Sequence, residues 1–129
     1  MNPVTGLSLG RIAIGAAALA RPDLVTRMFG VDVAANPQAG FVARLFGSRE
    51  VALGVATLAA SGRGRTGLVL LGVGVDLADA VAGHLAPREQ GLEVLDARVM
   101  SGVASGAVLS GLLGLRTGPR GRASGPVPD

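Results

Sequence analysis

The chain has 129 residues, which is enough for one domain and too few for two. Apolar residues make up 49% of it and charged residues only 16%, whereas a soluble domain carries about 25% charged residues. This composition, together with the absence of cysteine, excludes a disordered acidic tail, a disulfide scaffold and a cysteine-based metal site.

All 12 basic residues are arginines, and the net charge is +3. A charge this small and this scattered is not typical of a nucleic-acid interface. The arginines are not interleaved with aromatic side chains either, as a stacking platform for single strands would require. We therefore expect no nucleic-acid partner.

Breaker residues divide the chain into four mainly apolar segments, 4–20, 38–61, 66–86 and 92–115. At a rise of 1.5 Å per residue, helices of roughly this length match a hydrocarbon core about 30 Å thick. The sequence thus predicts an all-α fold: a four-helix transmembrane bundle with short loops over 1–115, followed by a flexible tail over 116–129. The longest connector contains Leu24-Val25 and Met28-Phe29 at helical spacing, which is typical of a segment in the membrane interface.

A soluble helical bundle is the alternative, because charged residues interrupt three of the four segments. The scarcity of charge elsewhere favours the membrane. So does the frequent glycine, which destabilises a soluble helix by about 1 kcal/mol but lets helices approach closely in lipid.

The arginines that flank the segments predict how the bundle is oriented. Five of them lie on the side of the termini and three on the opposite side; they are Arg63, Arg65, Arg116, Arg120 and Arg122 against Arg21, Arg27 and Arg88. By the positive-inside rule we expect a multi-pass protein of the bacterial cell membrane with both termini in the cytoplasm. The N-terminus lacks the features of a cleavable signal peptide.

Helical spacing sorts small and charged residues onto common faces. The expected faces are Ala43, Gly47, Glu50, Gly54, Thr57 and Ser61 in the second segment, Gly72, Asp76, Asp79 and Gly83 in the third, and Gly102, Gly106, Ser110 and Gly114 in the fourth. Small residues at this spacing favour close helix packing. We therefore expect these faces, with their carboxylates, to point into the bundle.

Eight charged residues lie in the layer expected near the middle of the bundle, and their formal charges cancel. They are Arg11, Arg44, Arg49 and Arg98 against Glu50, Asp76, Asp79 and Asp96. An unpaired charge at the centre of a bilayer costs about 3 kcal/mol or far more, so we expect ion pairs. Depth in the bundle predicts the pairs Arg49–Asp76 and Arg44–Asp79.

These charges have two interpretations: structural ion pairs that fix the helix register, or the lining of a polar cavity. In the second interpretation, Glu50, Asp76 and Asp79 are the candidate acids and bases, and Arg11, Arg44, Arg49 and Arg98 are the candidate ligand-binding residues. Two carboxylates three residues apart repel each other, so one could act as an acid while the other stays ionised.

The corresponding function is an intramembrane site for a lipophilic small molecule or membrane lipid that carries a polar group, with isomerase- or cyclase-type acid–base chemistry as an extension. Whether the protein is an enzyme stays open. The alternative is a non-catalytic subunit that stabilises a larger membrane complex through its glycine faces. A proton or ion carrier is the third hypothesis. Whether the protein forms a homo-oligomer is left open. Because His84 is the only histidine, we expect no metal, and we expect no cofactor.

The run from Arg44 to Gly54 (RLFGSREVALG), followed by Asp76 and Asp79, resembles a family. It is similar to small four-helix actinobacterial membrane proteins of a domain-of-unknown-function family related to the DoxX-like group. In that family an Arg-x-x-Gly-x-Arg-acid segment opens the second helix and an acidic pair lies in the third. The resemblance covers about residues 4–115 and implies a membrane fold, but it supplies no activity.

Overall fold

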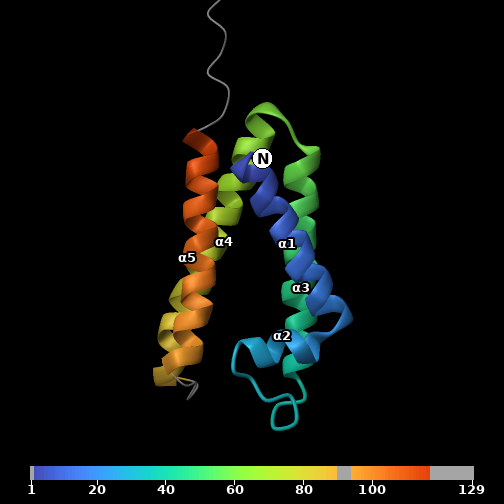
Figure 1. The fold of residues 1–129 in the computed structure, drawn as a ribbon, viewed down its shortest axis with the longest axis vertical. Helices are drawn as coiled ribbons and strands as arrows, with labels where there is room; N and C mark the ends of the chain where they lie inside the picture. The colour runs from blue at the N-terminus through green and yellow to red at the C-terminus, as the bar shows by residue number, and fades with distance from the viewer. Residues whose placement is uncertain (1, 90–93, 117–129) are drawn as a thin grey trace, which may run out of the picture.

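The computed structural model describes residues 2–89 and 94–116, and the described chain forms five α-helices without a strand. Their bounds are α1 Pro3–Ala20, α2 Pro22–Met28, α3 Ala39–Ala59, α4 Gly62–Glu89 and α5 Val94–Arg116 (Figure 1). The all-α class is confirmed, and the four long helices cover the four apolar segments, although α4 begins four residues before the expected start and continues past Pro87. The expected tail over 117–129 lies outside the described residues.

Proline and capping residues explain where the first two helices begin and end. Pro3 is the first residue of α1, and the Asn2 side chain accepts a hydrogen bond of 3.0 Å from the backbone of Val4. The connector predicted to lie in the interface forms the short α2, which ends at Met28 and is followed by Gly30 with a φ of 71°. There the Val31 amide bonds the Thr26 carbonyl at 2.9 Å, the pattern of a Schellman cap.

The helices associate as two antiparallel pairs. Helix α1 packs mainly on α3, and α4 mainly on α5, while the contacts between the pairs are fewer. Figure 1 shows the pairs meeting at the end that holds the N-terminus and diverging toward α2. At the meeting end, α5 approaches the first turns of α1, where Gly114 lies against Val4 and Gly111 against Leu7.

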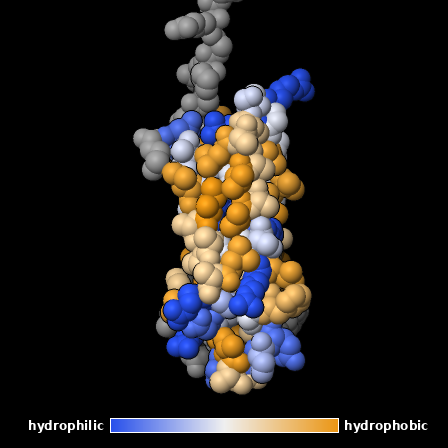
Figure 2. All heavy atoms as spheres, turned by 90° about the vertical axis from the view of Figure 1, so that its right-hand side faces the viewer, coloured by the Kyte–Doolittle hydropathy of each residue, from blue (hydrophilic) through white to orange (hydrophobic). Residues whose placement is uncertain are grey.

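The burial pattern is the reverse of that of a soluble protein. The buried hydrophobic residues of the described chain are all valines and alanines, while leucines such as Leu9, Leu70 and Leu109 are exposed. Polar and charged side chains are buried instead, namely Ser8, Arg11, Thr26, Glu50, Thr57 and Asp76. Figure 2 shows hydrophobic residues over the middle of one face and hydrophilic residues mostly toward its ends. Such an outward apolar surface suits a lipid surrounding.

Two helices are long and apolar enough to cross a membrane: α1, over Pro3–Ala20, and α4, over Gly62–Leu85. Only 28% of the first span and 22% of the second are buried, so neither is the enclosed core helix of a globular protein. Helix α3 contains three charged residues, and the apolar part of α5 is shorter, at Gly102–Arg116. Two of the four long helices therefore have the length and composition of a membrane span.

Glycines bring α1 and α3 into close contact. A Cβ atom at Gly15 would lie 2.6 Å from the Gly47 carbonyl oxygen, and one at Gly54 would lie 2.7 Å from the Ser8 carbonyl oxygen. The predicted face of α3 is confirmed from Ala43 to Thr57, since its five members in that range are all buried. Ser61 lies beyond the end of α3 and is exposed.

The predicted face of α5 is confirmed only in part. Gly114 is buried against Val4, whereas Gly102 and Gly106 are exposed, with no atom within 4 Å of a Cβ built on either of them. Among the α5 residues whose burial the structure describes, Ala104 and Gly111 are also buried. The contacts of α5 with Val4 on α1 and Val73 on α4 therefore select a face that only partly overlaps the predicted one.

The glycine contact between α1 and α3 predicts that Gly15→Ala destabilises the protein by about 1–3 kcal/mol, because the added methyl group meets the α3 backbone. The matched variant Gly10→Ala, on the open side of the same helix, should gain up to about 1 kcal/mol from helix propensity. Circular dichroism during an SDS titration measures both. Equal stabilities of the two variants would contradict the packing.

Candidate functional site

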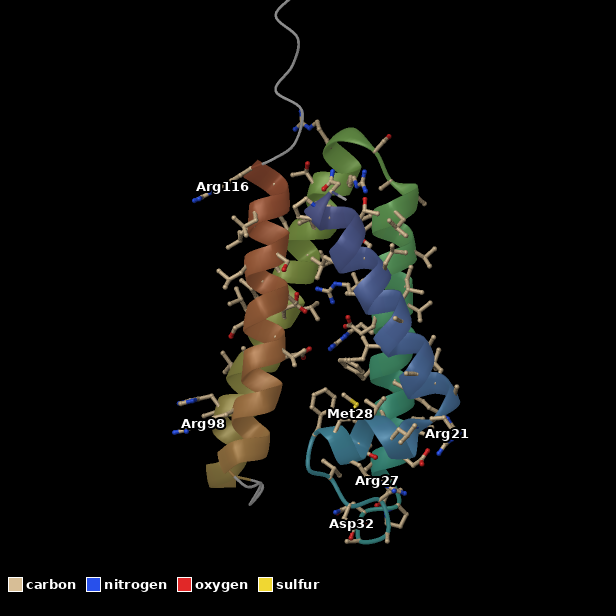
Figure 3. All side chains as sticks on the ribbon, viewed as in Figure 1. Arg21, Arg27, Met28, Asp32, Arg98 and Arg116 are labelled. Atoms are coloured by element: carbon tan, nitrogen blue, oxygen red, sulfur yellow. The ribbon has the colours of Figure 1, made fainter. Side chains whose placement is uncertain are left out.

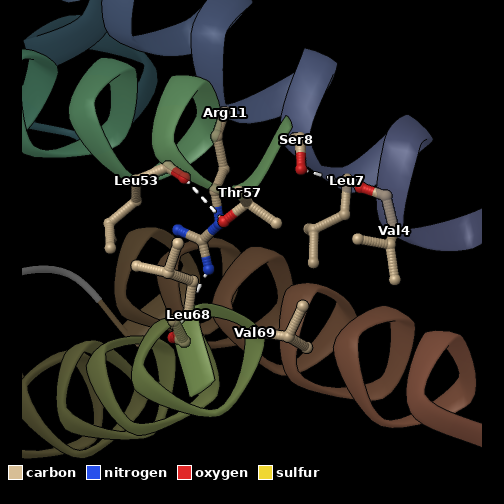
Figure 4. A pocket seen from close by; sticks show the side chains of 9 residues that line it. Val4, Leu7, Ser8, Arg11, Leu53, Thr57, Leu68 and Val69 are labelled. Carbon is tan, nitrogen blue, oxygen red and sulfur yellow. Dashed lines mark hydrogen bonds between the residues drawn. The ribbon is translucent and has the colours of Figure 1, made fainter. Parts of the chain in front are cut away.

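Arg11 connects three helices near the middle of the bundle. From α1, its Nη1 donates a hydrogen bond of 2.6 Å to Oε2 of Glu50 on α3, and its Nη2 donates to Oδ2 of Asp76 on α4. Nη2 also lies 3.4 Å from the Gly72 carbonyl oxygen. Figure 4 shows the guanidinium group between α3 and α4. The side chains of all three charged residues are no more than 8% exposed.

Arg49 continues this pattern toward α2. Its Nη1 and Nη2 donate to the two carboxylate oxygens of Asp79 at 3.3 and 2.6 Å, in the fork geometry that favours arginine over lysine. Its Nε donates to Oε1 of Glu50 at 3.2 Å. Positive and negative groups thus alternate along one series, which we call the ion-pair network: Asp76, Arg11, Glu50, Arg49 and Asp79.

The two ends of the ion-pair network differ in exposure. Asp76, Arg11 and Glu50 form a closed inner end, whereas the side chains of Arg49 and Asp79, the outer pair, are 36% and 38% exposed. Aromatic rings adjoin the outer pair only. The Arg49 guanidinium carbon lies 5.0 Å from the centre of the Phe46 ring, within cation–π range. Phe29, next to α2, meets Phe46 edge to face with ring centres 6.4 Å apart.

The predicted ion pairs are wrong, although the predicted charged layer exists. Asp76 pairs with Arg11 instead of Arg49, and Asp79 pairs with Arg49 instead of Arg44. Depth did not discriminate between Arg11 and Arg49, which both lie near the middle of their helices. The face of the helix decides which arginine binds Asp76, because Arg11 on α1 faces α3 and α4 together.

The other predicted site residues lie outside the ion-pair network. Arg44 is exposed, and its Nε lies 3.4 Å from the Leu19 carbonyl oxygen at the end of α1. Arg98 is exposed and points away from the other helix pair (Figure 3). The side chain of Asp96 lies outside the described residues, and His84 is exposed. The ion-pair network therefore contains two arginines and three carboxylates, instead of the expected four cations and four anions.

Two buried hydroxyl groups lie beside Arg11; the sequence places Thr57 on the inward face of α3, whereas Ser8 was missed. Ser8 donates to the Val4 carbonyl at 2.8 Å and Thr57 to the Leu53 carbonyl at 2.7 Å, each within its own helix. With Arg11 they line a cavity of about 10 Å³ (Figure 4), which is about the minimum for one water molecule. The position of Ser8, one helical turn before Arg11 on the same face, could have revealed it. This cavity is too small for a lipophilic ligand.

Across the described residues, no group of three or more carboxylate or imidazole side chains is placed to hold a metal ion. Comparison of the chain with protein-family models, curated proteins and solved structures gives no match. The resemblance to the DoxX-like group therefore stays a prediction, and the chemistry of the site has to be inferred from its geometry.

The three contacts of Arg11 predict that Arg11→Met destabilises the protein by about 3–5 kcal/mol, because Asp76 then stays buried without a counter-charge. Adding Asp76→Asn to this variant should restore most of the lost stability, since it removes the buried charge that has no partner. The stability of each variant is measured by circular dichroism during a titration with SDS. Arg98→Gln is the control and should change stability by less than about 0.5 kcal/mol. A double variant no more stable than Arg11→Met would contradict the assignment.

Proposed function

We propose that the protein is a multi-pass protein of the bacterial cell membrane in which α1, α3, α4 and α5 each cross the bilayer. The exposed apolar side chains and the two helices of sufficient length and apolarity support this proposal. An even number of crossings places both termini on one side. Arg63, Arg65 and Arg116 lie toward that side, which the positive-inside rule makes cytoplasmic.

This topology can be tested with single cysteines, because the chain has none of its own. We expect a membrane-impermeant maleimide added to intact cells to label Ala35→Cys, in the loop before α3. Ser61→Cys, between α3 and α4, should react only after the membrane is opened. Labelling of both positions in intact cells, or of Ser61→Cys alone, would contradict the proposed arrangement.

We further propose that the outer pair is a binding site for a lipophilic small molecule or membrane lipid that carries a polar group. One observation carries this proposal: a partly exposed, bidentate ion pair lies beside Phe46 and Phe29 in an otherwise apolar bundle. Ionisable groups within a membrane segment mark functional sites by default. Ligand sites typically combine apolar and aromatic walls with a few polar groups.

The same geometry limits any acid–base chemistry to one carboxylate. Glu50 and Asp76 are buried and both bind Arg11, so we assign them to positioning the arginines. Asp79 is the carboxylate that is both partly exposed and next to the aromatic rings through Arg49. If the protein catalyses an isomerisation or cyclisation, Asp79 is the residue that would exchange a proton with the substrate.

Ligand binding at the outer pair predicts that the wild-type protein, purified in mild detergent and then denatured, releases a lipophilic species in near-stoichiometric amount. Asp79→Asn should lose that species while it keeps its fold, since Arg49 keeps Glu50 as a charged partner and the asparagine oxygen can still accept a hydrogen bond from it. Mass spectrometry of the extracts and circular dichroism provide the two readouts. Arg98→Gln should retain the species, and identical extracts from all three proteins would contradict the proposal.

A second candidate function is that of a non-catalytic subunit of a larger membrane complex. It is favoured by Gly102 and Gly106, which leave an open strip on α5 where another helix could approach closely. In that case the ion-pair network would be structural throughout, and Asp79→Asn would alter no bound species.

A further inference from the structure

The ion-pair network has one carboxylate more than it has guanidinium groups. With all five groups ionised, two positive and three negative charges leave a formal charge of −1. Arg44 and Arg98 do not offset it, because Arg44 bonds a backbone carbonyl and Arg98 points away. In a medium of low dielectric constant, an uncompensated charge is strongly unfavourable. A positively charged ligand would offset the excess charge, as would a proton on one of the carboxylates.

The hydrogen-bond donors of the ion-pair network are directed at its own carboxylates. Both terminal nitrogens of Arg11 donate to carboxylates, and Arg11 is buried. Arg49 directs Nε at Glu50 and its two terminal nitrogens at Asp79. An anionic ligand would have to break these bonds in order to bind Arg11. Arg49 uses three of its five N–H groups in this way, and the negative formal charge of the network opposes an anion at the other two.

Acceptor capacity remains at Asp79. A carboxylate offers about four acceptor positions, and Arg49 uses one on each oxygen. Because the Asp79 side chain is 38% exposed, its remaining positions can be reached from outside. Asp79 is therefore the point at which a hydrogen-bond donor with a positive charge can join the network without displacing a member of it.

The surface beside the outer pair can accept an apolar chain. On α3, Val42, Leu45 and Phe46 lie three to seven residues before Arg49 and share its side of the helix. Val42 and Leu45 are exposed, as is Met28 at the end of α2. Figure 3 shows Met28 at the end of α2 nearer to α4 and α5, and Arg21 at the other end. An apolar chain that extends from Asp79 toward α2 would cover these residues.

We propose that the ligand is a lipophilic amine, with its ammonium group on Asp79 and its apolar part along Phe46 and Val42. This inference rests on the proposed function and adds the charge and class of the ligand. The ammonium group completes the alternation of charges, bringing the ion-pair network to three cations and three anions.

The test uses Met28→Trp, which introduces the only tryptophan of the chain, in nanodiscs of uncharged phosphatidylcholine. Three probes share a ten-carbon chain and differ in charge: decylammonium, decyl sulfate and decanol, each kept below its micellar concentration. We expect decylammonium to change the tryptophan fluorescence with at least tenfold higher affinity than decyl sulfate. Adding Asp79→Asn should remove this preference, because it brings the formal charge of the network to zero.

Arg49→Gln is the second variant and shifts the formal charge the other way, to −2. It should strengthen the preference for decylammonium over decyl sulfate. It therefore tests whether the preference follows the charge of the network even if Asp79→Asn does not fold. If decyl sulfate or decanol binds as tightly as decylammonium and the preference does not follow the charge, the assignment of an amine is overturned while the proposed binding site stands. If no probe changes the fluorescence of any variant, the binding site fails as well.

Discussion

The contact of one guanidinium group with two carboxylates sets the arrangement of this bundle. Arg11 lies at the middle of α1 and meets Glu50 and Asp76, which lie near the middles of α3 and α4. The donors of a guanidinium group have a fixed planar geometry, so these contacts fix both the depth and the rotation of each helix. A shift of one residue moves a helix by about 1.5 Å and turns its side chains by roughly 100°. The buried charges would then lose their partners, which makes such a register error costly.

Buried ion pairs are, however, poor sources of net stability, because desolvation offsets most of their attraction. Tight packing within each helix pair has another source, the glycines that bring α1 within backbone contact of α3. The ion pairs act where packing is weakest, between the α1–α3 pair and α4. Glycine packing therefore builds the pairs, and the ion-pair network specifies how the pairs meet. This division suits a lipid surrounding, in which apolar side chains have no preference for one another over the solvent.

Periodicity and breaker residues were sufficient to predict the long helices, because Pro3, Pro22 and Gly62 mark changes of backbone direction whatever surrounds them. They were also sufficient for the face of α3, where Gly47 and Gly54 share one stripe with Glu50. On α5 they succeeded only in part, because Gly114 is buried as predicted but the contact with Val73 selects Gly111 over Gly102 and Gly106. They failed on the partners of Asp76 and Asp79. An arginine side chain is long enough to reach several carboxylates at one depth, so the pairing depends on helix rotation, which spacing alone does not contain.

The difference between the two ends of the ion-pair network is what separates a scaffold from a site. The inner end needs no ligand to explain it, since Arg11 satisfies two buried carboxylates and is enclosed. The outer pair cannot be explained in the same way, because Arg49 already has Glu50 as a partner and Asp79 brings the network to a net negative charge. A bundle selected for packing alone would gain from an apolar pair at these positions. The excess carboxylate is consistent with a role that requires charge, and its place beside Phe46 and α2 puts that role where an apolar molecule can reach it.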